Sequence, residues 1–189
     1  MAVALFTGTN GIKGEVIFSE SPGGTKVHAV FTELPKGEHG FHIHKAGDLR
    51  GEGCKGACDH FHMGPKTQHG GPPNPTGKNQ ARHTGDLGNL TGPKDEVTYL
   101  LKGVTLDDLW GRSVIVHEDK DDLGKGPFED SHTTGHSGKR IGCAIIGRVQ
   151  TPAWGFGDMV AKSKLRCNGA TASTKTRKVR RNNRRNSTP

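Results

Sequence analysis

Gly40-Phe41-His42-Ile43-His44 is the stretch around which the rest of this sequence is organised. It is short and apolar, and it carries two histidines at spacing i, i+2. Successive side chains of a β-strand alternate between its two faces, so this spacing predicts that His42 and His44 project from the same face. Two imidazoles held in this way form half of a metal site, although the pair alone is equally compatible with a solvated strand face.

Composition favours many short strands and long loops over helices. The chain has 189 residues, 30% hydrophobic and 5% aromatic, and 29 of them are glycine. The length suits one domain with an appendage. No run of residues approaches the roughly 20 apolar residues that a membrane-spanning helix needs. The residues from Met1 to Thr7 lack the charged region of a signal peptide and are too few for its apolar region, so we expect an intracellular, cytoplasmic protein.

The positive charge is confined to the end of the chain. The formal net charge is +8, but residues 151–189 hold ten Lys/Arg against one acid, whereas residues 1–150 hold 17 against 18. We therefore expect a nearly neutral domain over residues 1–150 and a basic, disordered tail over 151–189. Six of the nine residues from 177 to 185 are basic, which suits nucleic-acid binding, nuclear localisation or simple solubility.

Alternating or strongly apolar residues predict strands in the domain but no convincing helix. The expected strands cover residues 3–6, 14–20, 27–31, 40–44, 97–101, 112–118 and 141–149. Thr9-Asn10-Gly11 is typical of a hairpin turn between the first two strands. Strands without helices indicate an all-β, antiparallel Greek-key barrel or sandwich.

Two long stretches show no periodic pattern, at residues 46–82 and 119–140. The first contains eight glycines and four prolines among its 37 residues. A structureless segment of this length is uncommon in a compact domain unless it is functional or disordered. Because it contains several histidines and cysteines, we expect a loop ordered by metal.

The histidines and one aspartate divide into two ligand sets that share His60. One set is His42, His44, His60 and His117, and the other is His60, His69, His83 and Asp86. Imidazoles suit copper and zinc, and three histidines with one aspartate suit tetrahedral zinc. If the ring of His60 loses both protons, it can bind one metal through each nitrogen and bridge the two ions.

Seven motifs now identify a family that this chain resembles. They occur in the order seen in copper–zinc superoxide dismutases: Gly40-Phe-His-Ile-His-Lys-Ala-Gly-Asp48, Asp59-His-Phe61, His69-Gly-Gly71, Arg82-His-Thr-Gly-Asp-Leu-Gly-Asn89, Val116-His-Glu118, Asp121-Asp-Leu-Gly-Lys-Gly126 and Gly138-Lys-Arg-Ile-Gly-Cys143. The resemblance covers residues 1–150 and implies an eight-stranded Greek-key β-barrel with two long functional loops.

The resemblance also implies a role for individual residues. It implies copper at His42, His44, His60 and His117, and zinc at His60, His69, His83 and Asp86, with His60 as the bridging and proton-transferring ligand. Asp121 resembles the carboxylate that orients one histidine of each metal, and its alternative is an ordinary acid in the surface run 119–122. Arg140 resembles the guanidinium that anchors superoxide, and its alternative is a surface arginine. Cys54 and Cys143 match the disulfide of the family, which leaves Cys58 and Cys167 unassigned.

Several positions depart from the family pattern. The segment 72–81 is longer than usual, and His62 stands where asparagine is common and offers a competing imidazole. Thr133, next to His132, replaces the lysine that steers superoxide, whereas Lys125 is retained; we therefore expect weaker and more pH-sensitive steering. Trp110 suits either a dimer contact or the core.

The function that follows is dismutation of superoxide to O₂ and hydrogen peroxide by a copper that is alternately reduced and oxidised. The expected partners are superoxide, a second copy of the chain in a homodimer, and a copper chaperone. If the gene is viral, the basic tail also suits packaging in a virion. The alternative is a copper-binding chaperone domain or an inactive decoy of the same fold. Such domains typically lose copper ligands or the arginine, and this chain retains them.

Overall fold

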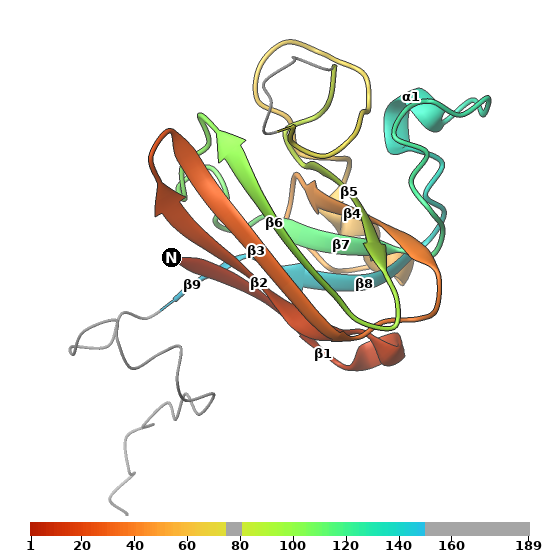
Figure 1. Cartoon of the computed structure of the whole chain (residues 1–189), viewed down its shortest axis with the longest axis horizontal. Coiled ribbons are helices and arrows are strands. Elements are labelled where there is room, and N and C mark those ends of the chain that lie inside the picture. The colour runs from red at the N-terminus through yellow and green to blue at the C-terminus, as the bar shows by residue number, and fades with distance from the viewer. Residues whose placement is uncertain (75–80, 150–189) are drawn as a thin grey trace, which may run out of the picture. The chain divides into compact units, whose positions relative to one another are not determined.

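Two antiparallel β-sheets form the fold (Figure 1), and the computed structural model describes residues 1–74 and 81–149. In chain order the strands are β1 Ala2–Thr7, β2 Lys13–Ser21, β3 Gly24–Glu33, β4 Glu38–His44, β5 Asp86–Thr91, β6 Asp95–Lys102, β7 Ser113–His117, β8 Arg140–Ile145 and β9 Gly147–Arg148. The helical segments are the 3₁₀ turns η1 Thr9–Gly11 and η2 Glu52–Ala57 and the short helix α1 Ser131–Thr134.

The strand order confirms the all-β Greek-key prediction. One sheet has the order β6-β3-β2-β1-β9, and the other has the order β5-β4-β7-β8. The chain changes sheet between β3 and β4, between β5 and β6, between β6 and β7, and again between β8 and β9. Within residues 1–74 and 81–149 no hydrogen-bonded ladder joins the two sheets, so the domain is a sandwich and not a closed barrel.

The core forms because alternate residues of each strand point between the sheets. Val16 and Phe18 of β2 are fully buried, as the alternating pattern predicts. Phe31 of β3 meets Phe41 of β4 edge-on, with ring centroids 5.8 Å apart. Strand β4 is buried on both faces: its odd-numbered residues Phe41 and Ile43 face the core, and loops cover the opposite face. That second buried face is where the two histidines of the central stretch lie.

The structure differs from the strand predictions in three places. The segment Asp86–Thr91 forms β5, which the sequence pattern did not predict, because its Asp-Leu-Gly-Asn-Leu-Thr sequence lacks strict alternation and its pairing with β4 decides its state. The last predicted strand is divided at Ile146: β8 pairs with β7, whereas β9 pairs with β1 in the other sheet. Arg140 begins β8 and does not lie in the preceding loop. The predicted hairpin turn at residues 9–11 forms η1.

Two long connections carry most of the polar chemistry. They run between β4 and β5 and between β7 and β8, and the second includes α1 (Figure 1). The disulfide between Cys54 and Cys143 joins the first connection to β8, which confirms the predicted pairing. Cys58 is a free, exposed cysteine. Cys167, residues 75–80 of the predicted insertion and the predicted tail 151–189 lie outside the described residues.

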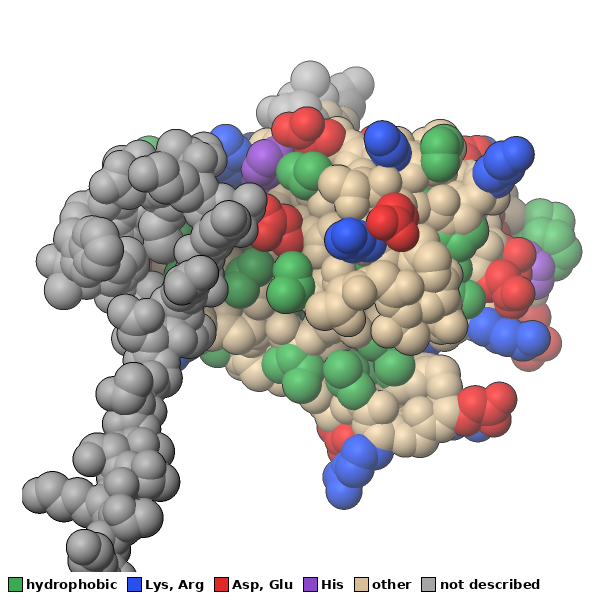
Figure 2. Space-filling model, turned by 90° about the horizontal axis from the view of Figure 1, so that it is seen from below, with side chains coloured by type: hydrophobic (Ala, Val, Ile, Leu, Met, Phe, Trp, Pro, Cys, Tyr) green, Lys and Arg blue, Asp and Glu red, His purple; other side chains and the backbone are tan. Residues whose placement is uncertain are grey.

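The surface of the described domain carries both signs of charge. On the face drawn in Figure 2, lysine and arginine side chains are interspersed with aspartate and glutamate, and apolar side chains lie among them. This agrees with the nearly neutral balance of charge in residues 1–150. None of the helices in the described part of the chain has the length and apolar character that crossing a membrane requires.

Candidate metal centre

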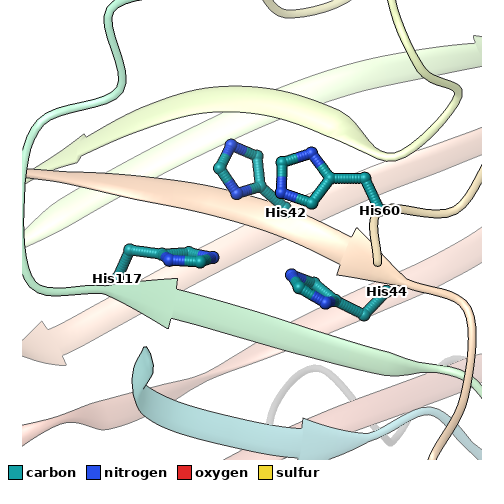
Figure 3. A group of neighbouring side chains, drawn as sticks. All are labelled: His42, His44, His60 and His117. Carbon is teal, nitrogen blue, oxygen red and sulfur yellow. The ribbon is translucent and has the colours of Figure 1, made fainter. Parts of the chain in front are cut away.

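Strands β4 and β7 provide the rigid side of the site. They pair in antiparallel register, with His44 opposite Ser113 and Phe41 opposite Val116, so β4 presents His42 and His44 beside His117 at the end of β7. His60 is held next to His44 by an isolated β-bridge. In Figure 3 the four rings, two from β4, one from β7 and one from the loop, surround one space. The i, i+2 prediction for the central histidine pair is therefore confirmed.

Four ring nitrogens in this group are buried and have no hydrogen-bond partner among the described residues. They are His42 Nδ1, His44 Nε2, His60 Nε2 and His117 Nε2. One ligand atom from each residue of the group lies within 4.8 Å of every other. Buried polar atoms are nearly always satisfied in proteins, so four unsatisfied acceptors that converge indicate a cation that all four bind.

The opposite nitrogen of each of these rings is engaged. His42 Nε2 donates to Asp121 Oδ2 at 2.8 Å, and His44 Nδ1 donates to the Cys58 carbonyl at 2.8 Å. His117 Nδ1 donates to the Gly138 carbonyl at 3.2 Å. When one ring nitrogen holds the proton, the other nitrogen has a free lone pair. These hydrogen bonds therefore select the tautomers that bind a metal.

A second group converges on Asp86. Its Oδ1 lies 2.9 Å from His60 Nδ1, 3.0 Å from His69 Nδ1 and 3.3 Å from His83 Nδ1. The backbone N–H groups of Gly70 and His83 donate to its Oδ2, which fixes the carboxylate. Three imidazole nitrogens and one carboxylate oxygen are a suitable donor set for tetrahedral zinc. The ring of His60 contributes its Nδ1 here and its Nε2 to the first group, so the two groups share one side chain.

Asp121 links the two groups through hydrogen bonds to one histidine of each. Its Oδ2 accepts from His42, and its Oδ1 accepts from His69 Nε2 at 2.8 Å, with all three side chains fully buried. The amide of Asn89 pairs with the backbone of Asp121 in both directions, at 2.7 and 2.9 Å. The surface-acid alternative for Asp121 is therefore wrong. Asn89 therefore positions Asp121, a role that nothing in the local sequence pattern indicates.

Burial keeps the first group neutral. Desolvation, together with the neighbouring imidazoles, lowers the pKa of His42, His44, His60 and His117. For His117 the pKa falls to about 3. Neutral imidazole is the form that binds metal ions, so this group is ready to bind at neutral pH.

In the second group, hydrogen bonds between carboxylates and imidazoles shift the pKa values of His69 and Asp86. Burial lowers the pKa of His69, but hydrogen bonds to Asp121 and Asp86 outweigh it and raise the pKa to about 9. Burial raises the pKa of Asp86, but hydrogen bonds from its imidazole neighbours hold that pKa far below its ordinary value. In the absence of a cation, protons thus compensate the buried negative charge, and a metal ion would displace them.

A cleft of about 840 Å³ opens onto the first group. The rings of His44, His60 and His117 lie at its base, together with Arg140. Arg140 is half-buried, and its guanidinium donates to the Cys54 carbonyl at 2.8 Å and to the Cys58 carbonyl at 2.6 Å. It is thus fixed in the cleft, which the surface-arginine alternative did not anticipate.

Comparison with known proteins agrees with this geometry. The copper/zinc superoxide dismutase (SODC) family matches residues 12–146 of the chain. The chain belongs to this family. It is 42% identical over 154 residues to the Superoxide dismutase [Cu-Zn] of Paramecium bursaria Chlorella virus 1, a match that covers 77% of each chain. It is 41% identical over 153 residues to Superoxide dismutase [Cu-Zn] 3 of Arabidopsis thaliana, a match that covers 77% of this chain and 89% of the relative.

Copper and zinc are the metals of this superoxide dismutase family, and the donor atoms fit both. All residues that the sequence analysis assigned to the two ligand sets are brought together. A third set, His42, His69 and Asp121, is a hydrogen-bonded relay, because both carboxylate oxygens already accept from the two rings.

The structure shows the surroundings of His62 and Trp110, two positions that the sequence left open. His62 is not a member of any metal-binding group of the described residues; its Nε2 donates to the Pro65 carbonyl at 2.7 Å and its Nδ1 accepts from the Thr84 N–H at 3.3 Å. Trp110 is partly buried and packs against the core, with the Arg148 guanidinium 3.6 Å from its ring centroid.

Proposed function

We propose that this protein dismutates superoxide, converting two superoxide anions and two protons to O₂ and hydrogen peroxide. Copper would be held by His42, His44, His60 and His117, and zinc by His60, His69, His83 and Asp86. The observation that carries the proposal is the single ring of His60, whose two nitrogens belong to the two converging donor groups. The family membership and the names of the two relatives support the same activity.

When bound, copper supplies the one-electron chemistry by which one superoxide is oxidised and the next is reduced. The residues of the chain supply the protons and the geometry. His60 lines the cleft, and its Nε2 is one of the four converging nitrogens of the first group, so it is placed to hold a proton and release it to the peroxide that forms. Its Nδ1 remains directed at the zinc group, and this keeps the ring in position while the proton moves.

Arg140 is placed to orient the substrate. A guanidinium has five N–H donors, and two of the Arg140 donors are used by the carbonyls of Cys54 and Cys58. The remaining donors are available to a small anion in the cleft. Because Arg140 is held by the backbone beside the disulfide, it needs little reorganisation when superoxide arrives.

The first test combines metal analysis with a superoxide dismutation assay of the purified, copper-loaded protein. We expect one copper and one zinc per chain, and activity well above that of solvent. Arg140→Ala is expected to retain both metals and to lower turnover by about 100- to 1,000-fold, since it removes one charged donor from the transition state. Unchanged turnover in this variant would contradict the anchoring role. Full metal loading without dismutation in the wild type would instead favour a copper-binding chaperone or decoy.

The partners of the enzyme are separate proposals. Homodimerisation is tested by analytical ultracentrifugation over a range of concentrations, and delivery of copper by a chaperone is tested by transfer to the zinc-loaded protein. Phosphate binding by residues 151–189 predicts retention on DNA that falls steeply with salt and disappears when the tail is removed. Packaging in a virion and a cytoplasmic location are tested by fractionation of the producing cell or virus.

A further inference from the structure

Two walls border the cleft above the copper-type group. One wall belongs to the connection after β4 and includes His62, Gly64, Lys66 and Thr67. The other belongs to the α1 segment and includes Asp130, His132, Thr133 and Thr134. An anion that diffuses toward Arg140 passes between these walls, so their fixed charges act on it before any contact is made.

Two of the three Lys and Arg side chains that line the cleft among the described residues have polar partners. Lys45 Nζ lies 3.1 Å from Asp59 Oδ2. The guanidinium of Arg140 is bound to two backbone carbonyls at the base. These groups therefore provide little attraction at long range, apart from the net charge of Arg140 itself.

Lys66 is different. It is exposed, it lines the cleft, and within the described ranges it has no ion pair or hydrogen bond. The α1 wall opposite has no lysine or arginine. Lys125, which the sequence analysis noted as a retained lysine, is exposed but does not line the cleft. Among the described residues, Lys66 is thus the cleft's uncompensated ammonium group.

We propose that Lys66, on the wall opposite α1, is the residue that steers the superoxide anion into the cleft toward Arg140. The inference depends on the proposed function for the identity of the anion. Lys66 acts through its charge and does not touch the reacting atoms, so it is a residue that sets the rate of encounter and not a catalytic residue. A unit charge roughly 7 to 10 Å from the path of an anion changes its local concentration in water by about two- to threefold at low salt.

The experiment compares Lys66→Gln and Lys66→Glu with two control variants that remove the same charge. Lys102→Gln lies at the end of β6 in the other sheet, and Lys125→Gln tests the other candidate lysine. The rate constant for superoxide disappearance is measured on fully metallated protein at ionic strengths from about 10 mM to 0.5 M. We expect Lys66→Gln to lose about two- to threefold at low salt and Lys66→Glu about the square of that factor. All variants should converge at high salt, where the Debye length becomes shorter than the distance over which the charge acts.

A second readout does not require turnover. Azide, a small anion that binds copper, is titrated into the copper- and zinc-loaded variants at low salt and followed by visible absorption. We expect the Kd for azide to rise in Lys66→Gln by the same factor as the rate falls, and to remain unchanged in Lys102→Gln. Equal behaviour of Lys66→Gln and Lys102→Gln in both readouts would overturn the proposal, as would an effect confined to Lys125→Gln. If the wild type lacked dismutase activity, the proposed function would fail, while the azide titration would still decide whether Lys66 attracts anions.

Discussion

The substitution Asp121→Asn separates the role of this residue as an acceptor from its size. In the protein, Asp121 Oδ2 accepts from His42 Nε2, and Oδ1 accepts from His69 Nε2 and from the Leu123 N–H at 2.7 Å. Asparagine has nearly the same shape but only one acceptor oxygen, and its NH₂ group is a donor. In either orientation, one of the two imidazoles therefore faces a donor in place of an acceptor.

The affected imidazole is expected to change its tautomer. Its Nε2 would accept from the amide, and the proton would move to Nδ1. In both rings Nδ1 is the atom directed at a metal group, since His42 Nδ1 is buried without a hydrogen-bond partner and His69 Nδ1 lies 3.0 Å from Asp86 Oδ1. One of the two metals must then compete with a proton, and loss of such an orienting partner typically weakens metal binding by about 10- to 100-fold, or roughly 1.4 to 2.7 kcal/mol.

The assay is a competition titration of each metal against a chelator of known affinity, performed on the wild type and on Asp121→Asn. Asp119→Asn serves as the matched control, because Asp119 is an exposed acid in the same run of charges. We expect the control to bind both metals as the wild type does. If Asp121→Asn bound copper and zinc with unchanged affinity, the tautomer argument would be refuted. An equal loss in Asp119→Asn would show that net charge, and not the hydrogen bonds, is responsible.

Three further predictions follow from the same geometry. In Gly135→Ala the added Cβ would overlap Asp121 Oδ1 and His69 Nε2, so we expect weaker zinc binding in a titration. Gly103→Ala is the control, because Gly103 has a similar positive φ (71° against 68° for Gly135) but open space around it, and this variant should bind zinc normally. The metal-free protein should lose stability in acid. In the folded protein the pKa of His117 is about 3, so the ring stays neutral, whereas in the unfolded chain it takes up a proton below about pH 6.5. The contribution of His117 to the free energy of unfolding is therefore complete above about pH 6.5, and about 2 kcal/mol of it is lost by pH 5. The buried neighbours His42, His44 and His60 act in the same direction, and a urea midpoint that did not fall between pH 7 and pH 5 would contradict this account. Finally, Cys143→Ser removes a disulfide that spans 89 residues and should lower the free energy of unfolding by about 4 to 5 kcal/mol in the chain-entropy model. Cys58→Ser, at an exposed free thiol, should leave the free energy of unfolding unchanged. Urea titrations measure both effects.

The fold could be anticipated where its signal is local. Alternation in β2 and β3 predicted which side chains are buried, because a period of two is a property of the strand itself. The segment Asp86–Thr91 gave no such signal, since only its pairing with β4 makes it a strand. The division of the last strand at Ile146 likewise depends on which neighbour each half meets, β7 or β1.

For the metal centre, the sequence by itself determined which donor types are present and that His42 and His44 share a face. It could not determine which nitrogen of each ring is free, because that depends on carbonyls and carboxylates far away in the chain, such as Gly138 for His117 and Asp121 for His42. Nor could it determine that Lys66 lines the cleft, because the two walls belong to loops separated by more than 60 residues. Residue identity sets what a side chain can donate or accept, and only tertiary structure decides which partner takes each atom and which atom remains for a metal or an anion.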